Sequence, residues 1–216
     1  MTGRFITFEG GEGVGKSTQV RLLAEHLSAS GHSVVTTREP GGSPFAERIR
    51  DVLLEPGKPQ GTALAEALLF SSARADHLAA TIRPALARGA WVISDRFMDS
   101  TRAYQGAGGS LSEGEIDALE SLVIGQTRPD LTVILDLEAR GGLMRAGLRQ
   151  AATMPADASR DPFEARDLAF HERLRQGFLA IAAREPQRCA VVDASAPAHV
   201  VAARIREVVI RRFGAA

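Results

Sequence analysis

The chain has 216 residues, 44% of them hydrophobic, which is enough for one domain with a full hydrophobic core and requires no second domain. Lys and Arg together number 26, as do Asp and Glu, so no global field attracts nucleic acid or an anionic membrane and we expect neither as a partner. No run approaches the roughly 18 apolar residues of a membrane span, and a glycine-rich loop follows Glu9 before any signal-like stretch develops. We therefore expect a cytoplasmic protein, with its single cysteine, Cys189, buried in the core.

Apolar, β-branched segments alternate with segments of helical period along the chain. We predict strands at residues 4–9, 32–39, 90–95, 131–137 and 188–194. We predict helices at residues 16–30, 45–55, 62–88 with a bend near Pro84, 111–125, between 137 and 149, 163–185 and 197–213. This order indicates an α/β fold, a five-stranded parallel sheet with helices on both faces, in one domain over residues 1–216. Residues 150–161 lack periodicity, and such irregular segments are typical of lids or binding loops.

The run EGGEGVGKST, from Glu9 to Thr18, joins the first strand to the first helix and matches the phosphate-loop pattern G-x-x-x-x-G-K-[ST]. In such a loop backbone amides and the helix N-terminus bind phosphate oxygens, the lysine reaches the β and γ phosphates, and the hydroxyl is offered to Mg²⁺. The residues expected to bind a nucleoside triphosphate in this way are Gly10, Gly11, Glu12, Gly13, Val14, Gly15, Lys16, Ser17 and Thr18.

Glu12 is unexpected in this loop, because a carboxylate beside a triphosphate should repel it. Two interpretations are open. The side chain is either a solvated acid at the tip of the loop, or an acid directed away from the phosphates toward another group.

Other features narrow the class of nucleotide-binding protein. The chain contains no Asn, so it lacks the N-K-x-D motif with which a guanine switch protein reads its base, and its length leaves little room for a larger ATPase machine. A small phosphotransferase is the class that remains. Asp95, at the end of the strand in WVISDR, is a candidate second acid near the metal; the alternative is an acid at a helix N-terminus.

Five segments in order and spacing resemble bacterial thymidylate kinases over essentially the whole chain: FEGGEGVGKST, TREPGG, LLFSSARADH, SDRFMDSTRAYQG and RPDLTVILD. The resemblance implies the five-stranded sheet of the nucleoside-monophosphate-kinase type. It also implies transfer of the γ-phosphate of Mg·ATP to thymidine monophosphate (dTMP), giving the diphosphate (dTDP), by a homodimer that associates through helices. Two alternatives stay open: a kinase for another nucleoside monophosphate or a deoxynucleoside, and a non-catalytic ATP-binding module.

The resemblance also assigns roles on the acceptor side. Phe70 resembles the ring that stacks on thymine, although its helical period also suits an ordinary core residue. Arg74 falls on the same helix face and resembles the donor to a thymine carbonyl, although a surface Arg is the default in this Arg-rich chain. The remaining matches are Arg96 as the clamp on the acceptor phosphate, Arg50 and more weakly Arg38 as further phosphate ligands, Thr101 and Gln105 near the base, and Tyr104 against the sugar. The bond between Glu39 and Pro40 is often cis in this family.

Catalysis in this family needs positive charge on the migrating phosphoryl group. Some members place an arginine in the phosphate loop directly after the acid, but here that position is Gly13, so the charge is expected from a lid at about residues 149–163. Arg149 resembles the lid arginine, with Arg145 and Arg160 as alternates. Pro162 stands where many relatives have Arg, which leaves the choice open. The resemblance directs Glu12 toward the sugar 3′-hydroxyl or the water shell of the metal. The expected catalytic set is Lys16, Glu12, Asp95 and Arg149, with Ser17 and Asp95 at Mg²⁺ and Arg145 at ATP.

Overall fold

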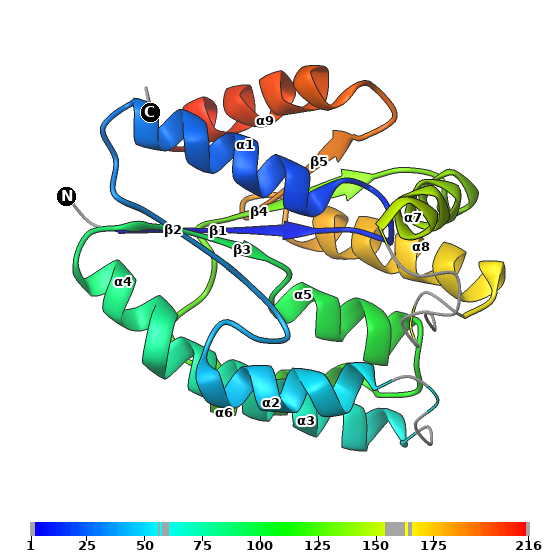
Figure 1. The fold of residues 1–216 in the computed structure, drawn as a ribbon. Helices are drawn as coiled ribbons and strands as arrows, with labels where there is room; N and C mark the ends of the chain where they lie inside the picture. Colours follow the sequence, from blue (N-terminus) through cyan, green and yellow to red (C-terminus); the bar gives the residue numbers. More distant parts are fainter. Residues whose placement is uncertain (1–2, 56, 58–60, 154–162, 164–165, 215–216) are drawn as a thin grey trace.

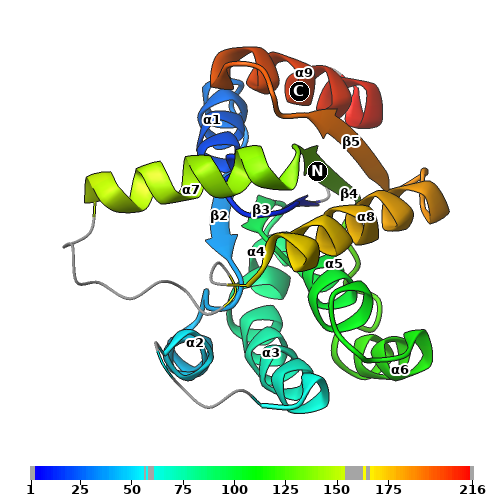
Figure 2. The ribbon, with the colours of Figure 1, turned by 90° about the vertical axis from the view of Figure 1, so that its right-hand side faces the viewer.

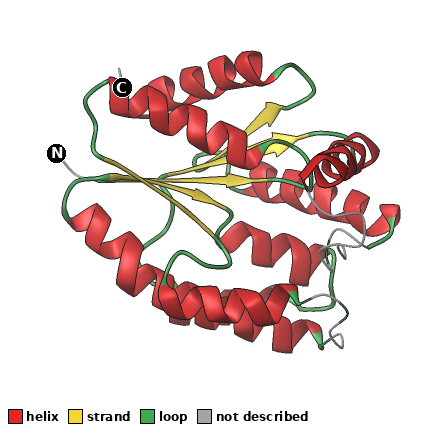
Figure 3. Cartoon of the chain, in the orientation of Figure 1, coloured by secondary structure: helices red, strands yellow, loops and turns green. Residues whose placement is uncertain are grey.

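A five-stranded parallel sheet forms the centre of the protein (Figures 1 and 3). The structure is a computed structural model that describes residues 3–55, 57, 61–153, 163 and 166–214. The strands are β1 (Arg4–Glu9), β2 (Val34–Arg38), β3 (Trp91–Asp95), β4 (Leu131–Asp136) and β5 (Cys189–Asp193), arranged in the order β2-β3-β1-β4-β5. The predicted fold class is confirmed.

Helices cover both faces of the sheet (Figure 1). They are α1 (Lys16–Ala29), α2 (Pro44–Leu54), α3 (Ala63–His77), α4 (Arg83–Ala87), α5 (Met98–Thr101), α6 (Glu113–Val123), α7 (Ala139–Thr153), α8 (Leu168–Arg184) and α9 (Ala198–Phe213), with π-helical segments η1 (Leu78–Ile82) and η2 (Arg102–Ala107). None of the helices in the described part of the chain is long and apolar enough to cross a membrane.

Successive side chains of β1, the central strand, point to opposite faces of the sheet and so belong to two separate layers of the core. Ile6 and Phe8 belong to the cluster that packs α1 and α9 onto the sheet, through residues such as Leu23 and Ile205. Phe5, directly before Ile6 in the strand, packs in the cluster on the opposite face. Because both faces are covered, the strands are nearly continuously apolar, which is what made them recognisable in the sequence. The expectation for Cys189 is also confirmed, since it is buried in β5.

The structure differs from the predicted elements by more than two residues in four places. The stretch predicted as one helix over 62–88 contains η1 just before Pro84, whose missing N–H interrupts the helical ladder. The sequence analysis assigned no helix between β3 and α6, where α5 and η2 lie, because their polar, glycine-containing sequence shows no amphipathic period. Residues 150–153, predicted to be irregular, continue α7. The helix predicted from residue 163 begins at Leu168, where the Asp167 side chain accepts from the Phe170 N–H as an N-cap.

The carboxyl ends of the strands all lie at one edge of the sheet, because the strands are parallel. The register pairs Phe8 with Asp95 and Thr37 with Ser94, so the chain after β1 and the chain after β3 leave the sheet side by side. Figure 2, which looks onto this edge, shows α7 lying across it. Loops at such an edge are where ligands bind in open α/β sheets.

A buried ion network anchors α5 beneath this edge. Asp99 is fully buried and accepts two hydrogen bonds from Arg188, at 2.6 and 2.9 Å. Arg188 also donates to Thr132 and to Glu185. The network therefore connects α5 with the start of β4 and with the residues that precede β5, and it holds the segment after β3 in place from below.

Replacing Arg188 by Met should lower the free energy of unfolding by about 3–5 kcal/mol, because Asp99 would remain fully buried with only the more distant Arg102, at 3.5 Å, as its cation. The matched control is Arg184→Met, which removes an exposed ion pair with Glu113 and should change stability by only about 0–1 kcal/mol. Urea denaturation of both variants measures the difference. Equal losses in the two variants would contradict a supporting role for the Asp99 network.

Candidate active site

The phosphate loop takes the shape that its sequence predicts. The loop leaves β1 after Glu9, and α1 begins at Lys16 with Gly15 in the left-handed conformation at the N-cap (φ 95°). No side chain caps this N-terminus, so its first N–H groups are available to an anion. Of the predicted loop residues, Glu12, Gly13, Gly15, Lys16, Ser17 and Thr18 line a cavity of about 470 Å³, whereas Val14 is buried in the core and Gly10 packs against β4.

Lys16 lies within the loop that it is expected to serve. Its ammonium donates to the carbonyl oxygens of Gly10 at 3.1 Å and Gly11 at 2.7 Å. Burial and, next, the charge of Arg96 lower the pKa of Lys16 to about 8, although the acids around it oppose the shift. The lysine is thus poised over the phosphate cradle, and its proton is lost more easily than that of a surface lysine.

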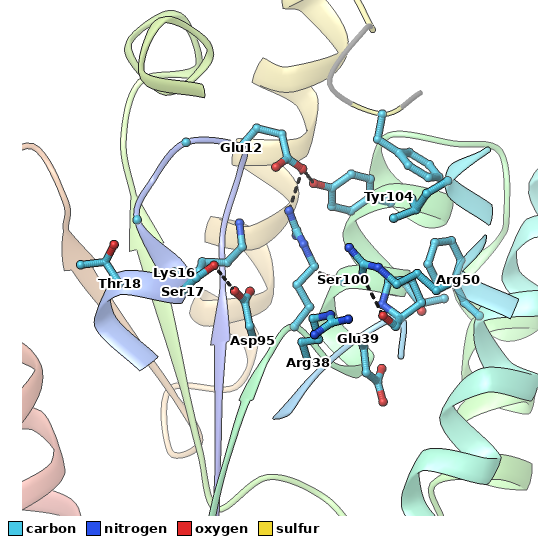
Figure 4. Close-up of a pocket in the computed structure, with 18 of the residues that line it drawn as sticks. Glu12, Lys16, Ser17, Thr18, Arg38, Glu39, Arg50, Asp95, Ser100 and Tyr104 are labelled. Atoms are coloured by element: carbon cyan, nitrogen blue, oxygen red, sulfur yellow. Dashed lines mark hydrogen bonds and ion pairs between the residues drawn. The ribbon is translucent and has the colours of Figure 1, made fainter. Parts of the chain in front are cut away.

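Ser17 and Asp95 come together as predicted. The Ser17 hydroxyl donates to the Asp95 carboxylate at 2.6 Å, across the gap between α1 and the end of β3 (Figure 4). Hydroxyl and carboxylate oxygens are the donors that Mg²⁺ prefers, with phosphate oxygens and water completing its shell. The described residues contain no cluster of three or more His, Cys, Asp or Glu that would hold a metal alone. The pair therefore fits a Mg²⁺ ion that arrives with a nucleotide.

Glu12 points across the cavity and away from the phosphate cradle (Figure 4). Its Oε1 accepts from an Arg96 guanidinium nitrogen at 2.7 Å and from the Tyr104 hydroxyl at 2.5 Å. Its side chain is only 15% exposed, so a solvated acid at the loop tip is excluded. Burial alone would raise its pKa, but the charges of Arg96 and Lys16 outweigh burial and lower it to about 2. Glu12 is an ionised acid that joins the phosphate loop to the opposite wall.

Arg96 is held in an uncommon backbone conformation. It has φ 70°, a left-handed value that costs a non-glycine residue about 1–3 kcal/mol. Its N–H donates to the Phe8 carbonyl at 2.9 Å and its own carbonyl accepts from Ser94 at 2.7 Å. Its guanidinium lies over the Tyr104 ring, 5.0 Å from the centroid. These contacts aim the guanidinium into the cavity.

Glu9 supports the turn that presents Arg96, and the sequence analysis gave it no role. It is fully buried, and its carboxylate accepts from the N–H groups of Phe97 and Ser100 and from the Ser100 hydroxyl. Ser100 in turn accepts from the Arg96 guanidinium at 3.2 Å. Burial and the nearby Asp99 raise the pKa of Glu9 to about 7. An acid at the end of a buried strand, next to a phosphate loop, was the available signal.

Aromatic rings form the far side of the cavity. Phe70, of α3, and Tyr104, of η2, both line it, and Phe163 lies between them with centroids 6.0 and 5.6 Å away. Phe163 was not predicted, since its segment resembled only the start of a helix. Thr101, Arg50 and Arg38 also line the cavity, as do the unpredicted Glu39, Pro40, Leu54 and Ser100. The Glu39–Pro40 bond is cis.

Besides Gly10, Gly11 and Val14 of the loop, three predicted residues among those that the structure describes do not line this cavity. Arg74 is only 3% exposed and donates to Glu39 at 2.7 Å, to Thr101 at 3.1 Å and to the Phe97 carbonyl at 3.0 Å. Gln105 lines a smaller neighbouring cavity of about 230 Å³ that shares Tyr104 and Phe163 with the main one. Arg145 donates to the carbonyl oxygens of Ala194 and Ser195 after β5. Both Arg74 and Gln105 therefore stand directly behind the cavity wall.

The predicted lid is described only in part. Arg149 lies in α7 and lines the main cavity, as the lid prediction requires. Arg160 and Pro162, with most of the lid segment, lie outside the described residues.

Comparison with known proteins identifies the family. The family model described as thymidylate kinase matches residues 8–205. The chain belongs to the thymidylate kinase family. It is 55% identical to the thymidylate kinase of Caulobacter vibrioides over 212 residues, 98% of each chain, and 54% identical to that of Nitrobacter winogradskyi over 94% of this chain and 86% of the relative. The crystal structure of thymidylate kinase from Ehrlichia chaffeensis matches with a TM-score of 0.76 and 36% identity, over 97% of this chain and 99% of that one. The chain is accordingly an enzyme, a phosphotransferase.

The affinity for ATP should fall as the pH rises through the pKa of Lys16. With a pKa of about 8, Lys16 is charged in roughly a tenth of the molecules at pH 9, so the dissociation constant should rise about tenfold between pH 7 and pH 9. Calorimetric titration with ATP measures it. Lys16→Arg is the control, because a guanidinium stays charged over this range and its weaker binding should not depend on pH. A flat profile in the unmodified enzyme would contradict the prediction.

Proposed function

We propose that the cavity holds ATP on the phosphate loop and dTMP against the wall formed by α3, α5 and η2. Phosphorylation of dTMP to dTDP by ATP is the reaction of this family. The observation that carries the proposal is the Glu12–Arg96–Tyr104 cluster. It joins a triphosphate-binding loop directly to an arginine and a ring on the opposite wall, where a second nucleotide has room to bind. Family membership disfavours the alternative of a non-catalytic ATP-binding module.

The donor side consists of the loop amides, Lys16 and the N-terminus of α1. Lys16 exchanges its bonds to the Gly10 and Gly11 carbonyls for the β and γ phosphates. Ser17 and Asp95 would hold Mg²⁺, which neutralises developing phosphate charge when bound. Arg145 stands beside the loop after β5, where it can border the rest of ATP.

The acceptor side combines cations with rings. Arg96 and Arg50 bind the phosphate of dTMP, with Arg38 at the exposed rim of the cavity. A planar guanidinium suits a phosphate because it donates two parallel hydrogen bonds. Phe70 and Phe163 offer flat faces to the thymine base. Thr101 faces the base directly, whereas Arg74 and Gln105 reach it from behind the wall or act through the residues that they hold.

The reaction needs positioning and charge more than covalent participation by the protein. A phosphate oxygen of dTMP attacks the γ-phosphorus of ATP, the bond from that phosphorus to the β,γ-bridging oxygen breaks, and ADP leaves with the electron pair. Arg149 and Lys16 stabilise the charge on the transferred group. Glu12 stays ionised at neutral pH and orients Arg96 and Tyr104. In this proposal it is directed toward the sugar 3′-hydroxyl of dTMP. A cytoplasmic location remains a prediction of the sequence.

A coupled ATP assay against a panel of nucleoside monophosphates tests the proposal. dTMP should give the highest kcat/KM, and the reaction should require Mg²⁺. Phe70→Ala should raise the KM for dTMP about tenfold or more with little change in kcat, because loss of base stacking removes about 1–3 kcal/mol of binding. Ile210→Ala, at an exposed position on α9 outside the cavity, is the control and should leave both constants unchanged. If Phe70→Ala lowered only thermal stability, Phe70 would be a core residue with no part in base binding.

We further propose that the enzyme is a homodimer that associates through α2, α3 and α6. These helices pack side by side on one face of the protein, with α3 in contact with both others (Figure 1). Large apolar side chains stay exposed on them: Phe45, Val52, Leu64, Leu68 and Leu122. Several large apolar side chains exposed on neighbouring helices are typical of a protein interface.

Leu68→Glu should convert the dimer to a monomer, because a charge would be buried at the centre of the interface. Size-exclusion chromatography with light scattering measures the mass. Ile210→Glu on α9, which changes a residue of similar exposure (43% against 50%), should leave the dimer intact. A native enzyme that is monomeric at all micromolar concentrations, or two variants that behave alike, would contradict this interface.

A further inference from the structure

The phosphate loop and the helix α7 touch through two glycines. A Cβ atom on Gly13 would lie 1.9 Å from the carbonyl oxygen of Gly142 and 3.0 Å from the backbone nitrogen of Ala146. A Cβ atom on Gly142 would lie 2.3 Å from the carbonyl oxygen of Glu12. Neither position has space for a side chain, because the atoms in the way belong to the backbone. The loop at residues 12–13 is thus packed directly onto the start of α7.

This contact is specific to one face of α7. Gly142 and Ala146 are both buried, and Arg149 follows at the i+7 position from Gly142, on the same helix face. The other glycines of the helix do not share the constraint. A Cβ atom on Gly141 would meet only the Leu137 side chain at 3.9 Å, and one on Gly147 would meet nothing within 4 Å.

Of the two described candidates for the lid arginine, Arg145 and Arg149, the one on this face of α7 is Arg149. Arg149 lines the main cavity, whereas Arg145, one turn nearer the helix start, donates to the carbonyl oxygens of Ala194 and Ser195. Arg149 comes seven positions after Gly142, about 10 Å along the helix axis. A displacement or tilt of α7 at Gly142 would therefore be carried to the Arg149 guanidinium by a rigid element.

We propose that Gly13 and Gly142 are positioning residues: their backbone contact fixes α7 on the phosphate loop so that Arg149 reaches the transferred phosphoryl group. The inference rests on the proposed function. It explains why the arginine at the transferred phosphoryl group belongs to α7 and not to the phosphate loop. Because α7 occupies the space beside Gly13, no side chain can stand at that loop position. The contact between Gly13 and α7 leaves no space for an arginine in the loop, and the same contact places Arg149 of α7 at the cavity.

Gly142→Ala tests the contact, because only the Glu12 carbonyl opposes the new methyl group in an otherwise helical position. Displacement of α7 should lower kcat about tenfold to a hundredfold, the usual effect of misplacing a catalytic group by about 1 Å. The KM for dTMP should stay within twofold, because α3, α5 and η2 form that side of the cavity. Gly141→Ala is the matched control: it makes the same change one residue earlier in the same helix, and it should leave kcat unchanged.

The Arg149→Ala background separates positioning from a general structural effect. If Gly142 acts through Arg149, adding Gly142→Ala to Arg149→Ala should lower kcat by less than about twofold, since the effects of coupled residues are not additive. Equal losses from Gly142→Ala in both backgrounds, or a native kcat in the single variant, would overturn the inference. If Arg149→Ala alone left turnover normal, the role proposed for Arg149 would fail, which is a different result from failure of the glycine contact.

Discussion

The ion pair between Glu12 and Arg96 is the interaction on which the arrangement of the site depends. It connects the loop after β1 to the turn after β3, two segments that the parallel register brings to the same edge of the sheet. Both side chains are only 15% exposed, so each would be costly to bury without the other. With Tyr104 bound to the same carboxylate oxygen, the pair sets the distance between the triphosphate loop and the acceptor wall.

The turn that carries Arg96 is stabilised from the interior. A left-handed arginine is unfavourable by itself. The hydrogen bond that its N–H donates to the Phe8 carbonyl and the one that its carbonyl accepts from the Ser94 hydroxyl offset that cost. Glu9 then caps the amides that follow, and Arg188 neutralises Asp99 one layer deeper. The charged groups continue from the cavity into the core. Residues far from any substrate therefore contribute to the aim of the guanidinium.

Much of the site was predictable because its residues occur in local patterns. The phosphate loop and the pairing of Ser17 with Asp95 follow from short motifs and from the parallel sheet, whereas Phe70, Tyr104 and Arg149, which line the same cavity, were implied by the resemblance to thymidylate kinases. Phe163 and Glu9 were missed because they act through contacts with residues distant in sequence. The resemblance gave Arg74 a role at the base; its side chain lies against Glu39, Thr101 and the Phe97 carbonyl, contacts that the spacing of residues on one helix does not specify.

The sequence by itself determined the fold class, the triphosphate-binding loop and the family, since each of these is encoded in periodicity or in runs of adjacent residues. It also posed the question of Glu12 without answering it. Only the tertiary structure decided that this acid pairs with Arg96 and Tyr104, and that α7 meets the loop at Gly13 with no space for a side chain. The physical reason is that ion pairs and backbone packing depend on distances in space, and the segments concerned are separated by more than 80 residues in the first case and by more than 120 in the second.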